Sequence, residues 1–111
     1  MPETASNVRQ ALDNLDNQVV DMVGTFIKRR KKHYEEAALK LHQNLKSDVA
    51  RYTEMAADQK ITGEDLELLI KGRWAQLKIE LLEEMSISKV KFEEVAVDVL
   101  KIALKTALLF I

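Results

Sequence analysis

The sequence contains no cysteine, one proline and three glycines among 111 residues, and only 5% of its residues are aromatic. The absence of cysteine excludes a disulfide framework, thiolate metal sites and a cysteine nucleophile. Glycine and proline are the residues that most often interrupt regular structure, and the single proline is residue 2. With 47% hydrophobic and 32% charged residues, this scarcity of breakers is typical of a single helical domain spanning residues 1–111.

An excess of one charge sign is also lacking. Seventeen basic and eighteen acidic residues give a formal net charge of -1. A balanced charge does not draw a whole protein to polyanions, and no RNA-binding or DNA-binding motif is present. We therefore expect no nucleic-acid partner.

Signals for export and membrane insertion are absent as well. The first 18 residues do not join a basic segment to an apolar one, so they do not predict a secretory signal. The most apolar stretch, residues 95–111, contains Asp98, Lys101 and Lys105. Each of these charges costs about 2.5 to 3.5 kcal/mol at the centre of a bilayer. We predict no membrane-spanning helix and, by default, a cytoplasmic protein.

The clearest helix boundary lies in the segment DQKITGEDLELL, residues 58–69. Thr62 is followed three residues later by Asp65, which is the spacing of a helix N-cap with an acidic first turn. One helix is therefore predicted to end near residue 57, and another to begin near residue 63.

Two interpretations fit the first half of the chain, where apolar residues recur every three or four positions on both sides of the basic run Lys28–Lys32. Lysine and arginine are good helix formers and no turn-forming residue occurs at 28–33, so we favour one continuous helix over about 6–57. In that helix Lys31 would lie in the apolar seam with its stem buried. The alternative is a break at 28–33, because the apolar seam changes phase between Phe26 and Tyr34.

The sequence of the second half of the chain predicts helices over about 63–85 and 88–111, which are either separate or continuous. Ser86 and Ser88 are candidate N-caps at the weak point MSISKVK, residues 85–91. Beyond it, the polar residues share one narrow stripe with spacings of three and four, and the rest of the helix from Val95 onward is apolar. The stripe consists of Lys91, Glu94, Asp98, Lys101 and Lys105.

A helix that is apolar around most of its circumference needs several neighbours. An antiparallel helical bundle completed by dimerisation would provide them, and this is the fold we favour. The alternative is an up-down-up-down four-helix monomer broken near 28–33. In either arrangement the basic run would lie level with residue 89.

The basic run is the most visible candidate site. On a continuous helix its five cations would encircle the axis rather than line one face. We consider polyanion binding by this belt as one alternative function. The candidate anion-binding residues are Lys28, Arg29, Arg30, Lys31, Lys32, Lys89 and Lys91.

No metal or cofactor site is predicted. His33 and His42, the only histidines, are nine residues apart and would lie on opposite sides of a helix. No Glu-x-x-His spacing, phosphate-binding loop or nucleophile elbow occurs. We therefore expect a protein that is not an enzyme.

The function that we favour is a helical interaction or assembly module that self-associates through its C-terminal helix, as a homo-oligomer or with another helical protein. Membrane-surface binding by residues 95–111 is a second alternative. Trp74 would be a core or interface anchor, and Gly72 beside it would allow a close helix approach. The predicted interface residues are Trp74, Val99, Ile102, Leu104, Leu108, Phe110 and Ile111.

Overall fold

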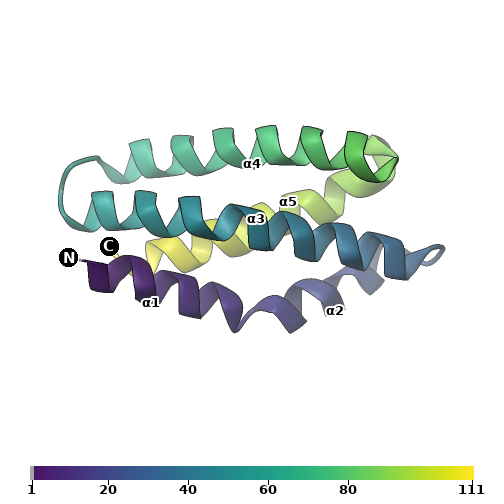
Figure 1. Cartoon of the computed structure of the whole chain (residues 1–111), viewed down its shortest axis with the longest axis horizontal. Helices are drawn as coiled ribbons and strands as arrows, with labels where there is room; N and C mark the ends of the chain where they lie inside the picture. The colour runs from purple at the N-terminus through teal and green to yellow at the C-terminus, as the bar shows by residue number, and fades with distance from the viewer. Residues whose placement is uncertain (1) are drawn as a thin grey trace.

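A computed structural model describes residues 2–111 and shows five α-helices (Figure 1). No strand occurs among these residues, which confirms the predicted all-α class. The helices are α1 (Pro2–Asp13), α2 (Asp16–Phe26), α3 (Lys31–Ala57), α4 (Gly63–Met85) and α5 (Lys89–Leu108).

The prediction of one continuous helix over 6–57 is wrong at two places. The first is a bend between α1 and α2, where Leu15 has φ -98° and ψ 2° and its N–H bonds to Leu12 at 3.0 Å. The helix also begins earlier than predicted, at Pro2, and a proline is tolerated at the first helical position because no helical acceptor is available there.

The second place is the basic run, where the chain leaves the helix at Ile27 (φ -121°, ψ 125°) and re-enters it after Arg30. Helix α2 packs against α3, which a straight helix would prevent because the two segments would then lie end to end, and Ile27 and Tyr34 are both buried in the resulting core. Burial of both seams therefore outweighs the helix propensity of lysine and arginine. Arg30 provides the turn by adopting a left-handed conformation (φ 56°, ψ 33°).

The two predicted boundaries in the second half are confirmed. Thr62 and Asp65 form a reciprocal capping box, with both hydrogen bonds at 3.1 Å. At the weak point, Ser88 caps α5 by accepting a hydrogen bond from the backbone of Lys91 at 3.5 Å, whereas Ser86 ends α4 with a positive φ. Helices α4 and α5 are separate, and α5 ends at Leu108 rather than at residue 111.

The helices pack as an up-down-up-down bundle in which α1 and α2 together form the first, bent member (Figure 1). Helix α3 packs against all four others, and α5 crosses behind it. This is the predicted alternative with a break at 28–33. Helix α5 also contacts all four other helices, so much of its apolar surface is buried within one chain, while Val90 and Leu108 stay exposed.

Candidate functional site

The polar stripe of α5 lies on the outer surface of the bundle, as its sequence pattern predicts. Lys91, Glu94, Lys101 and Lys105 are exposed, and Asp98 is half-buried. The opposite side of the helix is packed into the core, where several side chains have no exposed surface. The buried residues of α5 are Phe92, Val95, Ala96, Val99, Leu100, Ala103, Thr106 and Ala107.

A groove follows this stripe between α2 and α5. Four adjoining hollows share lining residues, so they form one continuous depression along the two helices, which we call the α2–α5 groove. Charged side chains of the α5 stripe line it. Its apolar lining consists mainly of half-buried side chains from both helices and from the α1–α2 bend, namely Leu15, Met22, Phe26, Val97 and Ile102.

The contribution of α2 to this groove did not emerge from the sequence. Val19, Met22 and Phe26 share one apolar seam, but only Val19 is buried in the core, while the other two line the groove. The unusual width of the apolar face at residues 19–27 was the available signal. A face wider than one neighbour can cover has apolar surface left for a second contact.

Four charges along the groove have no ion-pair partner within the described chain. Glu94, Asp98, Lys101 and Lys105 take part in none of the ion pairs formed between residues 2–111. By contrast Glu93, which also lines one hollow of the groove, contacts Lys78 of α4 at 3.1 Å. The groove therefore combines apolar surface with charged groups that remain available to a partner.

The basic run is a link between helices, so the prediction that its cations encircle a helix is wrong. Lys28, Arg29 and Arg30 precede α3, and Lys31 and Lys32 are its first two residues. The Lys31 side chain is 53% exposed and is not held in a seam. Its terminal atoms instead lie over Gly24, 3.2 to 3.3 Å from where a Cβ would stand.

The predicted proximity of this run to the start of α5 is confirmed. Lys28, Arg29 and Lys91 line the same hollow at one end of the groove, together with Val90, which is 85% exposed. Two helix N-termini meet at this end, and neither α3 nor α5 has an acidic residue in its first turn. The positive ends of both helix dipoles thus add to the lysine and arginine charges. We call the seven exposed cations the basic end: Lys28, Arg29, Arg30, Lys31, Lys32, Lys89 and Lys91.

The residues predicted to form an interface are distributed between the core and the surface. Trp74 is buried, and its indole N–H donates to the Ala96 carbonyl at 2.8 Å. Val99 is also buried in the core. Half-buried positions are Ile102, Leu104 and Phe110, and exposed positions are Leu108 and Ile111.

The proposed close approach at Gly72 is wrong. A Cβ added to Gly72 would meet no atom within 4 Å, so no neighbouring helix approaches it. Trp74 is instead covered by Lys78, whose ammonium group lies 4.4 Å from the centre of the indole ring.

Both histidines bond to backbone carbonyls of other helices. His33 Nε2 lies 3.1 Å from the Met85 carbonyl and so joins the start of α3 to the end of α4. His42 is buried at the α1–α2 bend, where its Nε2 lies 2.7 Å from the Leu12 carbonyl and 3.4 Å from Asp16 Oδ1. Within residues 2–111, no cluster of three potential metal ligands is found.

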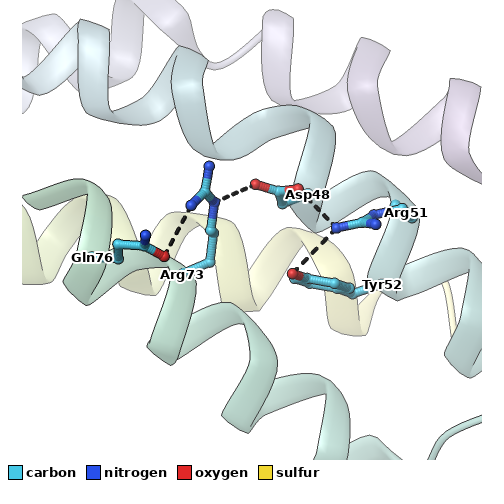
Figure 2. A network of polar contacts seen from close by, with 5 residues as sticks. All are labelled: Asp48, Arg51, Tyr52, Arg73 and Gln76. Carbon is cyan, nitrogen blue, oxygen red and sulfur yellow. Dashed lines mark hydrogen bonds and ion pairs between the residues drawn. The ribbon is translucent and has the colours of Figure 1, made fainter.

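A polar network joins α3 to α4 near the middle of the bundle (Figure 2). Arg73 donates from Nε to Asp48 at 2.6 Å and from Nη1 to Gln76 at 3.0 Å, and Arg51 donates to the other oxygen of Asp48 at 3.1 Å. The hydrogen bond to Asp48 raises the pKa of the Arg73 guanidinium. This network has a structural role, since it fixes the position of α4 on α3.

Comparison with known proteins found no matching family model, and neither a curated protein nor a solved structure matched the chain. Across the described residues, every helix is too short or too polar to cross a membrane. The class that the fold defines is therefore an all-α bundle, and any function must be argued from its surfaces.

Proposed function

We propose that this chain is a non-enzymatic interaction module that self-associates through α5. The observation that supports the proposal is the α2–α5 groove, which joins half-buried apolar side chains to four charged groups without partners in the described chain. Apolar area provides most of the free energy of such an interface, and charges at its rim provide orientation. Exposed apolar side chains extend this surface at both ends of the helix, with Val90 at one end and Leu109, 77% exposed, at the other.

The experiment is a measurement of mass in solution by light scattering, over a range of protein concentrations. We expect the unmodified chain to form a dimer, and Val90→Glu and Leu109→Glu to weaken it. Both side chains are exposed, so neither substitution should unfold the chain. The matched control is Leu68→Glu, which introduces the same charge at a leucine that is 68% exposed on α4.

A monomer at every concentration would contradict the proposal. So would a dimer that Leu68→Glu disrupts and the two α5 substitutions leave intact, because the interface would then lie on the outer face of α4.

Anion binding at the basic end is a second candidate function. It is favoured by the convergence of seven exposed cations with two helix N-termini that lack acidic residues in their first turns. The test is elution from a heparin column. Retention up to about 0.2 M salt, lost in a Lys28→Ser, Arg29→Ser, Lys91→Ser variant, would support it, because binding through several cations weakens steeply with salt. Elution below that salt concentration would count against it.

A further inference from the structure

The charges of the α5 stripe have an order that points to one particular partner. Passing from the start of α5, Glu94 and Asp98 are followed by Lys101 and Lys105. Glu94 and Lys105 lie at equal distances along the helix from the midpoint between Val99 and Leu100, and so do Asp98 and Lys101. A half-turn about that midpoint therefore exchanges acid for base at each of these positions.

We infer that the partner of the α2–α5 groove is a second copy of this chain, whose α5 runs antiparallel across the first and is centred between Val99 and Leu100. This inference rests on the proposed function and specifies its geometry. In such a pair Glu94 faces Lys105 of the copy, and Asp98 faces Lys101 of the copy. Two-fold symmetry repeats both contacts, so four pairs of opposite charge cross one interface.

Like-charged neighbours make part of the stripe unfavourable in an isolated helix, although Asp98 and Lys101 are opposite charges three residues apart. Glu94 and Asp98 are four residues apart, and so are Lys101 and Lys105, and like charges at this spacing repel on a helix surface. The helix dipole accounts only for Lys105 in the last turn, because its effect is confined to the terminal turns and the first turn of α5 carries Lys89 and Lys91 rather than acids. An antiparallel copy places an opposite charge against each member of both pairs.

Apolar side chains match under the same operation. Val90 at the start of α5 comes opposite Leu108 and Leu109 at the end of the copied helix, and all three are exposed in the single chain. Val97 comes opposite Ile102 of the copy, and both are half-buried. Charge and apolar surface therefore favour the same alignment. A parallel alignment would instead oppose each charge to its own kind.

The first test uses two charge variants of the full chain. A basic variant carries Glu94→Lys and Asp98→Lys, and an acidic variant carries Lys101→Glu and Lys105→Glu. We expect each alone to dimerise at least about tenfold more weakly than the unmodified chain, because its interface contains like charges only. An equal mixture of the two should form a heterodimer, and a chain carrying all four substitutions should dimerise like the unmodified one.

The second test uses the absence of cysteine from the sequence. Glu94→Cys and Lys105→Cys chains, mixed under mild oxidation, should form a disulfide-linked heterodimer. Glu94→Cys alone should not, because the two copies of residue 94 would be about 16 Å apart along the helices, beyond the reach of a disulfide.

The outcomes separate the inference from the proposed function. If the unmodified chain is monomeric, or binds anionic phospholipid vesicles through α5 without self-associating, both fail. If it dimerises but the charge variants behave like the unmodified chain, or Glu94→Cys cross-links with itself, the antiparallel alignment fails and self-association through another geometry stands. Circular dichroism melting of every variant checks that the monomer fold is intact.

Discussion

Single residues in the left-handed region form the tight links between the helices. Arg30, Gln59 and Ser86 have φ values of 56°, 62° and 51°, and each lies between two helices. Glycine usually occupies such positions because it has no Cβ to clash with the backbone. The three glycines of this chain lie elsewhere, and none has a positive φ. Each link therefore carries strain that a substitution can relieve.

We predict that Ser86→Gly raises the free energy of unfolding by about 0.5 to 1 kcal/mol, because glycine removes the left-handed penalty at the end of α4. The matched substitution is Ser88→Gly, two residues later. Ser88 caps α5 at a φ of -65°, so its loss should lower stability by about a few tenths of a kcal/mol. Urea unfolding followed by circular dichroism measures both. Equal effects of the two substitutions would contradict the assignment of strain to Ser86.

A second prediction at this scale concerns Asp48, which accepts hydrogen bonds from Arg73 and Arg51. Asp48→Asn should lower the free energy of unfolding by about 1 kcal/mol, because it removes the charge from a partly buried network. Asp21→Asn is the control, since Asp21 is exposed and forms no ion pair with another described residue. A similar loss in both variants would indicate a general charge effect.

The pH dependence of this contact follows from the raised pKa of Arg73. A cation with a higher pKa in the folded state stabilises the fold fully below its unfolded pKa, and this contribution is lost only as the pH rises through the folded value. For arginine that range is strongly alkaline. The difference in stability between Asp48→Asn and the unmodified chain should therefore show no titration of Arg73 between about pH 6 and about pH 9.

At the scale of whole elements, the helix boundaries reflect a competition between local propensity and burial. Lys28–Lys32 has the composition of a helix interior, yet three of its residues form a link because α2 must fold back onto α3 to bury the apolar faces of both. The boundary at Thr62 involves no such conflict, because the capping box and the seam agree. Local signals therefore locate a helix end reliably only where burial does not oppose them.

Amide hydrogen exchange tests the link directly. The backbone N–H groups of residues 28–30 should exchange rapidly, because they lie outside α2 and α3, while those in the middle of α3 should be protected. Protection throughout 28–32 would instead indicate the continuous helix that propensity favours. The experiment is run at a pH low enough to slow the intrinsic exchange reaction. NMR then resolves the exchange of individual residues.

At the scale of the whole molecule, one core joins all five helices, so unfolding should occur in a single transition. If the chain dimerises through α5, its melting temperature should rise with protein concentration, because association stabilises only the folded state. The basic variant with Glu94→Lys and Asp98→Lys should melt at a temperature that does not depend on concentration. A concentration-independent melting temperature for the unmodified chain would contradict dimerisation.

The sequence alone determined the all-α class, the capped boundary at Thr62 and the polar stripe of α5, whereas it left Ser86 and Ser88 as equal candidates for the cap of α5. These features depend on contacts between residues three or four positions apart. Helical periodicity and capping residues therefore predict them from the sequence. The order of the stripe charges is likewise present in the sequence. The inference of an antiparallel partner from that order also required knowledge of which face of α5 is exposed.

Only the tertiary structure decided that the basic run is a link, that Val99 and Trp74 belong to the core, and that α2 and α5 form a groove. Each of these outcomes depends on which helices become neighbours, and that choice is made by burying the apolar surface of the whole chain at once. A seam of residues such as Val19, Met22 and Phe26 shows that a face is apolar. Whether each side chain enters the core or lines the groove is set by the position of α5, which is distant in sequence.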